Sequence, residues 1–373
     1  MRLIPVTICR PGMKLAKPIY SEDGQILLGR HVELTDKLIR RLCECGISFV
    51  YIEDSLTSDL TIPELISDET RIKALSEVKA SFKGMVDLPK RRNGVTYPYV
   101  GRQFKNIMAM VIDEISSQKD AMIMLMNMGT VDHYLYQHSL NVCIYSVLLG
   151  MAYGYTTDEV MTLGLGALLH DIGKTQISKQ IMFKQSALTN EEFAEMKRHA
   201  EKGYYLLKDE PNIPLIVAHC AFQHHERLDG SGYPRGINGN EIHDYAKWIG
   251  LVDSYDAMTT SRVYRGPMLP HQAVEELYAG TGTLYEHSMV KLFRDKVAIY
   301  PIGLTVKLNT GESGVVVDIN TSCPHRPIIR VLYNEVGELL SSPYETDLTK
   351  QLTTMIVGVT GEESMSLSNA CGV

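Results

Sequence analysis

Residues 164–174, Gly-Leu-Gly-Ala-Leu-Leu-His-Asp-Ile-Gly-Lys, decide how the rest of the chain is interpreted. The run predicts an apolar helix that ends on His170 and Asp171, with Gly173 and Lys174 directly after. An imidazole and a carboxylate are both common metal ligands, and a lysine ammonium is a point charge that can meet a phosphate. About one helical turn therefore gathers a candidate ligand pair and a candidate phosphate-binding cation.

The composition is that of a soluble globular protein with a large core. The chain has 373 residues, of which 45% are apolar and 22% charged, which is enough for two or three domains. The net charge of -7 argues against a general polyanion-binding surface and excludes bulk nucleic acid as an expected partner. A phosphate-bearing ligand must then be met by a local cluster of arginine and lysine.

The cysteines and the apolar runs bear on the compartment. Seven cysteines, an odd number without repeating spacing, favour a reducing compartment without a disulfide framework. No run approaches the roughly 20 apolar residues that a membrane span needs. We therefore expect a cytoplasmic protein with no membrane span.

Changes in residue pattern divide the chain into five expected parts. Short β-type runs and one amphipathic helix after Thr35 predict a small α+β module at the N-terminus. Residues 62–82 look helical, the turn residues and basic cluster at 84–102 predict an exposed connector, and 104–128 predict a methionine-rich buried helix. The expected parts are a small α+β module (1–58), a helical linker region (59–103), a helical domain (104–298), a small β extension (299–358) and a disordered tail (359–373).

Capping patterns and turn residues place individual elements within this plan. Thr156 with Glu159, and Thr189 with Glu192, have capping-box spacing and predict helices that start near 157 and 190. After residue 299 the period changes, and runs at 301–308, 314–320, 327–333 and 337–340 predict a small antiparallel sheet. The expected fold is mainly α, with a small module at each end.

Histidines and aspartates in the helical region form a candidate ligand set. Seven nitrogen and oxygen ligands would come from five helices or helix ends, as expected for two metal ions bridged by a carboxylate and a water or hydroxide. Taken alone, a helical histidine is more often an ordinary surface or core residue. The candidates are His138, His170, Asp171, His199, His224, His225 and Asp253.

Three of these residues are hard to explain without a bound metal ion. Adjacent imidazoles on a helix point about 100° apart, so His224 and His225 can both face inward only at a helix end or a wide site. Asp253 lies in the largely apolar run 248–253, where an unpaired carboxylate would be costly to bury. A bound metal ion would relieve that cost.

Five ordered motifs resemble those of one known family. His170-Asp171 with Gly173-Lys174 resembles the motif that names the HD phosphohydrolases. The run His-His-Glu-Arg-Leu-Asp-Gly-Ser-Gly-Tyr-Pro, residues 224–234, resembles the signature of their HD-GYP subfamily. Three further matches are His138-Ser139-Leu140-Asn141-Val142, Lys197-Arg198-His199, and the run from Asp253 to Arg265. The resemblance covers residues 105–293, which makes residues 104–298 the expected catalytic domain.

The resemblance implies an all-helical phosphodiesterase for cyclic di-GMP, a bacterial second messenger. It implies hydrolysis to linear pGpG, GMP or both by a bridging hydroxide on a dinuclear centre, with iron or manganese as the metal. Carried over by position, the seven candidates above would be the metal ligands, with Asp171 as the bridge. Lys174 would lie beside the scissile phosphate, and Tyr233, Arg262 and Arg265 would contact the ligand.

Some roles stay open at this level. Lys174 could stabilise charge on the phosphoryl group or protonate the leaving 3′ oxygen, and we favour the first role. Gly230 and Gly232 would let the loop backbone approach the substrate closely. Some family members hold a third metal through a glutamate four residues before the first histidine. Tyr134 stands there in this chain, which predicts two metals.

Three alternatives remain beside the leading hypothesis. The chain could be a catalytically weak receptor for a cyclic dinucleotide, although all seven ligands are present. It could hydrolyse another cyclic dinucleotide or a nucleotide phosphomonoester, or act chiefly as a scaffold. Segments 10–52 and 300–348 resemble modules that flank such domains, but this resemblance does not indicate which signal regulates the protein. A homodimer or regulatory protein partners are equally open.

Overall fold

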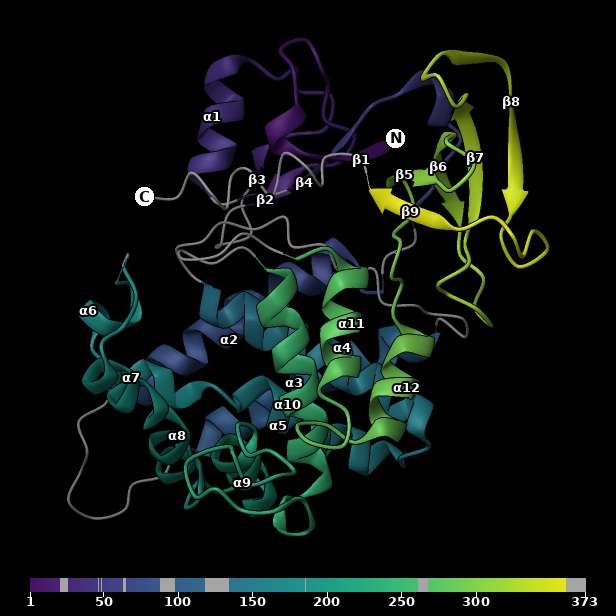
Figure 1. Ribbon diagram of the computed structural model, residues 1–373. Helices are drawn as coiled ribbons and strands as arrows, with labels where there is room; N and C mark the ends of the chain where they lie inside the picture. The colour runs from purple at the N-terminus through teal and green to yellow at the C-terminus, as the bar shows by residue number, and fades with distance from the viewer. Residues whose placement is uncertain are drawn as a thin grey trace.

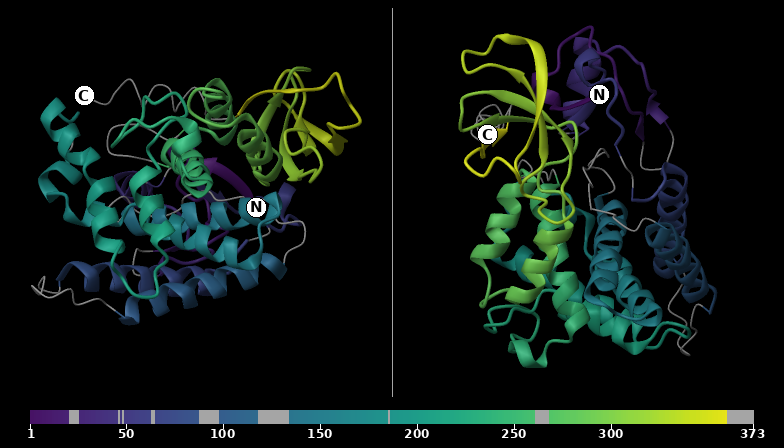
Figure 2. Two further views of the ribbon diagram at one scale, coloured as in Figure 1. Left: turned by 90° about the horizontal axis from the view of Figure 1, so that it is seen from below. Right: turned by 90° about the vertical axis from the view of Figure 1, so that its right-hand side faces the viewer.

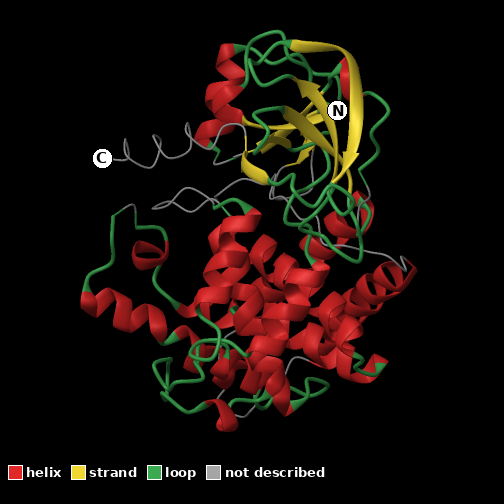
Figure 3. Ribbon diagram, turned by 45° about the vertical axis from the view of Figure 1, so that its right-hand side comes forward, coloured by secondary structure: helices red, strands yellow, loops and turns green. Residues whose placement is uncertain are grey.

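The computed structural model of the protein describes residues 1–20, 26–45, 47, 49–62, 65–87, 98–117, 134–184, 186–260 and 268–359. These residues form a helical core and, beyond one end of it, a lobe that contains all the described strands (Figures 1 and 3). The expected mainly α fold with small flanking modules is confirmed. No helix in the described ranges is both long enough and apolar enough to cross a membrane.

In the described ranges, nine helices of at least nine residues build the helical core. They are α2 (Asp68–Asp87), α3 (Pro98–Ser117), α4 (Tyr134–Tyr153), α5 (Thr157–Leu169), α8 (His199–Leu207), α9 (Leu215–Gln223), α10 (Asp244–Thr259), α11 (Pro270–Ala279) and α12 (His287–Lys296). Helix α4 packs against α5 and α10, while α9 packs against α5 and α8. The largest side chains at the centre are Trp248, Tyr145 and Phe293, all at most 1% exposed. Because α4 and α5 are buried on nearly every face, their sequences lack the polar stripe of a surface helix.

Shorter helical turns fill the connections. They are α6 (Lys179–Met182), α7 (Asn190–Lys197) and the 3-10 turns η1 (Val6–Ile8), η2 (Ser55–Thr57), η4 (Ile172–Gln176) and η5 (Gly239–Glu241). The capping boxes of Thr156 with Glu159 and of Thr189 with Glu192 are both formed, so the predicted starts of α5 and α7 are confirmed. Each box satisfies backbone N–H groups that the first helical turn leaves without partners.

The segment before the core departs from its expected role as a linker. Helix α2 extends through Gly84 to Asp87, and α3 already starts at Pro98, so both ends of the predicted connector are helical. Phe82 of α2 is fully buried and packs edge-to-face on Phe104, with the ring centroids 6.2 Å apart. Helix α2 is thus packed into the main core. The basic run 90–92 and the methionines at 122–128 lie outside the described residues.

The lobe is built from both ends of the chain. Its N-terminal part pairs β1 (Arg2–Pro5) with β4 (Phe49–Ile52), and β2 (Ile19–Tyr20) with β3 (Ile26–Leu28), both antiparallel. Helix α1 (Asp36–Glu44) starts where predicted, because the Thr35 side chain accepts a hydrogen bond from the Leu38 N–H. Its C-terminal part is an antiparallel sheet in the order β8-β7-β6-β5-β9.

The strands of that sheet match the predicted runs, with one addition. They are β5 (Thr305–Leu308), β6 (Ser313–Asp318), β7 (Ile328–Tyr333), β8 (Leu339–Asp347) and β9 (Ile356–Val359). Strand β8 is longer than its predicted run, and β9 was not predicted. In the register, Val306 of β5 lies between Gly314 of β6 and Val359 of β9, which places β5 inside the sheet.

The two parts of the lobe share one apolar interior. Leu3 and Phe49 pack in the same cluster as Val306 and Ile329. The first two residues and the last two come from opposite ends of the sequence. The Leu3 N–H donates to the Gly303 carbonyl at 2.8 Å. Figure 2 shows the sheet and the N-terminal strands side by side beyond the end of the helices. The terminal modules are therefore packed together.

Replacing Phe82 by alanine tests whether α2 belongs to the core. Phe82 is fully buried and also contacts the Tyr136 ring at 5.6 Å between centroids. We expect a loss of about 3–5 kcal/mol in unfolding free energy, measured by denaturant titration. The exposed neighbour Lys83 provides the control, because Lys83→Ala should leave stability nearly unchanged. An equally small effect for Phe82→Ala would show that α2 is only loosely attached.

Candidate metal centre

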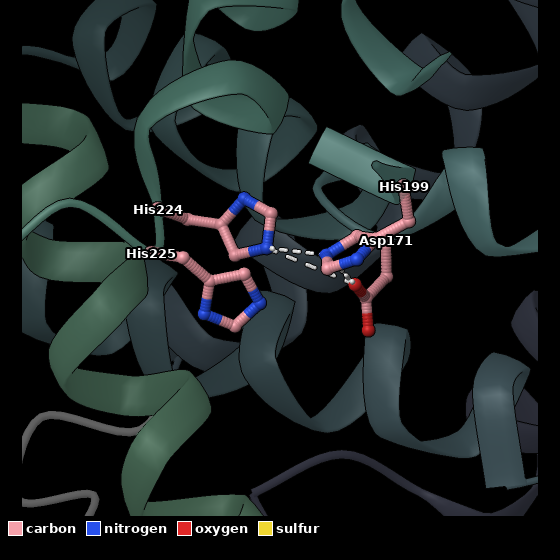
Figure 4. A group of neighbouring side chains, drawn as sticks. All are labelled: Asp171, His199, His224 and His225. Atoms are coloured by element: carbon pink, nitrogen blue, oxygen red, sulfur yellow. Dashed lines mark hydrogen bonds and ion pairs between the residues drawn. The ribbon is translucent and has the colours of Figure 1, made fainter. Parts of the chain in front are cut away.

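The candidate ligands come from ends and faces of five segments. His170 is the C-cap of α5, Asp171 precedes η4, His199 starts α8 and His224 is the C-cap of α9. His138 lies in α4 and Asp253 in α10. The break after α9 lets His224 and His225 both face the site, as their adjacency required, and Figure 4 shows both rings directed toward His199 and Asp171.

Asp171 lies at the centre of the cluster and is fully buried. Its Oδ1 lies 3.3 Å from His199 Nε2 and 3.7 Å from His224 Nε2. Its Oδ2 lies 3.5 Å from His138 Nε2 and 3.4 Å from His170 Nε2. The two oxygens of one carboxylate therefore face two different pairs of imidazoles.

Asp253 lies between the same two groups. Its Oδ1 is 3.0 Å from His138 Nε2 and its Oδ2 is 3.8 Å from His225 Nδ1. Two sets of side chains could each hold a cation, because their ligand atoms lie within 4.8 Å of one another. One set is Asp171 with His199, His224 and His225, and the other is Asp171 with His138 and His170.

Hydrogen bonds to backbone carbonyls fix which nitrogen faces the centre in three of the imidazoles. The Nδ1 of His170 donates to the Ala167 carbonyl at 2.7 Å, and the Nδ1 of His199 donates to the Met196 carbonyl at 2.7 Å. The Nδ1 of His224 lies 3.2 Å from the Cys220 carbonyl. A carbonyl can only accept, so each Nδ1 carries the proton and each Nε2 keeps its lone pair. That is the tautomer of a metal ligand bound through Nε2.

Burial and charge set the protonation of the site. Burial lowers the pKa of His199 to about 4, and burial also holds the pKa values of His224 and His225 well below their usual range. These imidazoles are thus neutral at pH 7. Burial alone would raise the pKa of Asp171, but the charge of the Lys174 ammonium holds it well below its usual range. The three histidines therefore offer neutral nitrogens beside an ionised carboxylate.

His138 is held from both ring nitrogens. Its Nδ1 donates to Asp256 Oδ2 at 2.7 Å, while Asn141 Nδ2 donates to Asp256 Oδ1 at 3.0 Å. Burial lowers the pKa of His138, but the bonds with Asp253 and Asp256 outweigh it and raise the pKa to about 9. A cation bound at Nε2 would take the place of that proton.

The unsatisfied atoms of the cluster fit a metal ion. His170 Nε2 and Asp171 Oδ1 are buried without a hydrogen-bond partner among the described residues. Leaving such atoms unpaired costs free energy, and metal ions held by the two sets of side chains would satisfy them. Imidazole nitrogens with carboxylate oxygens are a donor set that suits iron and manganese as well as zinc.

Gly173 lets the turn that carries Lys174 lie directly on α8. A Cβ added there would lie 1.9 Å from the His199 carbonyl oxygen and 2.5 Å from the Gly203 nitrogen. Both are backbone atoms, which cannot move aside as a side chain could. The contact brings Asp171 next to His199, and the Lys174 ammonium touches Asp171 Oδ2.

The loop after the histidine pair closes on itself through Glu226. This residue is only 4% exposed, and its carboxylate accepts from the N–H groups of Arg235 at 2.9 Å and Ile237 at 3.2 Å. A Cβ at Gly232 would lie 2.5 Å from the Arg227 nitrogen. In this structure Gly232 is thus needed for packing within the loop itself, whereas the sequence suggested approach to a substrate. The fold of the loop stacks the Tyr233 ring on the His225 ring, with centroids 4.6 Å apart.

Some predicted residues lie outside the described part of the chain. Arg262 and Arg265 fall in 261–267, and the Tyr134 side chain is not described either.

The sequence analysis gave no role to Asp256, although this residue lies in one of the quoted motifs. The sequence did contain an indication of its role. Asp256 is a second carboxylate three residues after Asp253 on a largely apolar helix, and a buried carboxylate needs a partner.

The chain is similar to known proteins over the helical core and the C-terminal sheet. Residues 111–289 match the HD domain family, and residues 305–368 match a KOW domain associated with the HD domain. A cyclic di-GMP phosphodiesterase of Pseudomonas aeruginosa is 30% identical over 99% of this chain and 94% of its own length. A cyclic di-GMP phosphodiesterase of Thermotoga maritima is 38% identical over 39% of each chain.

A HDG"Y"P protein from Bdellovibrio bacteriovorus matches with a TM-score of 0.48 at 19% identity. The match covers 79% of this chain and 98% of that chain.

Asp256→Asn tests the support of His138 separately from the ligands. The substitution keeps the shape but removes the charge that orients Nδ1–H, so we expect metal affinity to fall about 10–100-fold. Competition titration with a chromophoric chelator measures the change. Asp158→Asn, an exposed carboxylate on α5, should not alter affinity. Equal affinities for both variants would mean that Asp256 does not support the site.

Gly173→Ala tests the close approach of η4 to α8. We expect about 2 kcal/mol or more of destabilisation, because the added methyl meets backbone on both sides. Metal content should fall as well, since Asp171 would be pushed away from His199. Gly84→Ala is the control, because an added Cβ at this helical position has nothing within 4 Å. Undiminished stability and metal content in Gly173→Ala would contradict the geometry.

Proposed function

This chain belongs to the HD-GYP subfamily of the HD phosphohydrolases, and we propose that it hydrolyses cyclic di-GMP with two divalent metal ions as cofactors. A relative that is 30% identical over 99% of this chain is a cyclic di-GMP phosphodiesterase. A response regulator of Xanthomonas campestris with that activity is 38% identical over 36% of this chain. The products would be linear pGpG, GMP or both.

The observation that carries the proposal is the division of the imidazoles around Asp171. Because Oδ1 faces one pair and Oδ2 the other, Asp171 is suited to bridge two cations. We assign His199, His224 and His225 to one cation, and His138 and His170 to the other. Asp253, which lies near His138 and His225, would complete both sets.

The two metals, iron or manganese, would lower the pKa of a water molecule and neutralise charge on the phosphate oxygens. The protein supplies the rest of the arrangement. The neutral imidazoles of His199, His224 and His225 would bind a cation without a prior loss of protons, whereas His138 would give up its Nε2 proton. The buried helices exclude bulk water from the cluster.

Lys174 is the chain's own cation beside the reacting phosphate. Its ammonium is engaged with Asp171, so it is held at the metal cluster rather than free in solvent. From there it would stabilise the negative charge that develops on the phosphoryl oxygens, which is the role we favour. Transfer of a proton from Nζ to the leaving 3′ oxygen is the alternative role for the same atom.

We assign substrate contacts to Tyr233, Arg262 and Arg265. Tyr233 supports this because its ring stacks on a proposed ligand, His225, and so lies at the edge of the cluster. The two arginines follow α10, which carries Asp253, by three and six residues in sequence. A guanidinium can bind phosphate through two parallel hydrogen bonds and can stack on a purine, which suits either contact.

Another cyclic dinucleotide is the second candidate substrate. A Vibrio cholerae enzyme that is 34% identical over 42% of this chain is a 3′3′-cGAMP-specific phosphodiesterase. Both substrates present the same phosphodiester to the metals, so the distinction depends on contacts to the bases. Side-by-side turnover of the two dinucleotides separates the candidates.

The proposal is tested on protein purified without oxygen. Its bound metals are quantified, and cyclic di-GMP is followed by chromatography with and without added iron or manganese. We expect up to two metals per chain and conversion of the dinucleotide. The double variant His170→Ala with Asp171→Ala should lose its metals and reduce kcat by on the order of 1,000-fold, because it removes a terminal ligand and the bridge.

A matched control removes a histidine–carboxylate pair elsewhere. His31 and Glu53 form an exposed pair in the N-terminal module, so replacing both by alanine should leave metals and turnover intact. Full turnover in the His170–Asp171 variant would refute the site. Tight binding of cyclic di-GMP without turnover by the metal-loaded wild type would instead make the protein a receptor.

A further inference from the structure

Lys197 is a cation at the edge of the metal cluster that the mechanism does not use. It is the last residue of α7, two positions before His199. Its Nζ lies 5.0 Å from the centroid of the Phe193 ring and 5.7 Å from that of the Tyr233 ring. Both distances are within the range of a cation–π interaction, so two aromatic rings hold the ammonium.

The neighbouring basic side chains differ from Lys197 in being neutralised. Lys184 pairs with Glu192, and both Arg198 and Lys202 pair with Glu195. Lys197 has no carboxylate within 4.0 Å in the ranges that the structure describes. Aromatic rings attract a cation but do not cancel its charge. The ammonium therefore keeps an uncompensated positive charge beside the site.

A continuous series of contacts joins Lys197 to the metal cluster. The Tyr233 ring that it approaches stacks on His225 at 4.6 Å and lies 6.3 Å from the His199 ring. Lys197 and Tyr233 are both half-buried, so each keeps a face toward solvent. The charge thus lies outside the buried ligands but within one aromatic ring of them.

We propose that Lys197 binds the second, non-reacting phosphate of the cyclic dinucleotide. This inference rests on the proposed function. A cyclic dinucleotide carries two phosphodiester groups, and only one of them can lie on the metals. Lys174 is engaged with Asp171 at the metal cluster, whereas Lys197 lies beyond the His225 ring. A charge-assisted hydrogen bond from Nζ to the second phosphate would favour substrates with two phosphates over those with one.

Kinetics with two substrates test this role. The metal-loaded wild type and Lys197→Met are compared on cyclic di-GMP and on bis(p-nitrophenyl) phosphate, a diester with a single phosphate. For Lys197→Met we expect KM for cyclic di-GMP to rise about 10-fold with little change in kcat. Turnover of the one-phosphate diester and metal content should change little, and Lys197→Arg should restore KM.

Lys208→Met is the matched control. Lys208 also lies over an aromatic ring, that of Tyr205 at 5.2 Å, but at the far end of α8 from the ligand His199. An unchanged KM for cyclic di-GMP in Lys197→Met overturns the inference. Equal losses on both substrates also overturn it, because they would indicate a purely structural role. A wild type that cleaves the one-phosphate diester but neither binds nor cleaves cyclic di-GMP overturns the proposed function instead.

Discussion

A buried carboxylate surrounded by imidazoles is the constraint that the rest of the structure depends on. Asp171 is fully buried, and an isolated charge in such a place would be strongly unfavourable. It is tolerated because Lys174 contacts it and four histidine nitrogens lie within 3.7 Å of its oxygens. Those nitrogens come from α4, α5, α8 and α9. Four helices of the core therefore converge on one buried side chain.

Helix ends orient three of the imidazoles at this site. The last carbonyls of a helix lack intrahelical partners. His170, His199 and His224 each follow or end a helix, and each ring uses Nδ1 to approach a carbonyl three or four residues earlier. This hydrogen bond turns Nε2 toward Asp171, and at His224 the Cys220 carbonyl accepts it in addition to the His224 backbone N–H. A ligand in the middle of a helix has no free carbonyl, and His138 of α4 uses the Asp256 carboxylate instead.

The sequence predicted local features well and long-range packing poorly. Capping at Thr156 and the break after His224 depend on neighbouring residues, so their patterns were visible in the sequence. The candidate ligand set could be named because the order of the motifs resembles a known family. The bond of Asp256 with His138 and the contact of Gly173 with α8 each join segments that are far apart in the chain. No local sequence pattern predicts such contacts. The same holds for α2, whose weakly amphipathic sequence resembles a linker but whose Phe82 is buried.

The packing of the lobe could not be predicted from the sequence either, and it connects the lobe to the metal centre. Its interior joins Leu3 with Val306, and the bidentate pair of Arg330 with Asp59 fastens the two chain segments from outside. Leu269, directly before α11, is buried in this interior, while α11 itself packs on α10, which carries Asp253. On the other side α2, which follows the N-terminal module, packs against η4, which carries Lys174. Each end of the chain is thus packed, through one helix, against an element that bears a residue of the site, so the lobe and the centre share a single continuous scaffold.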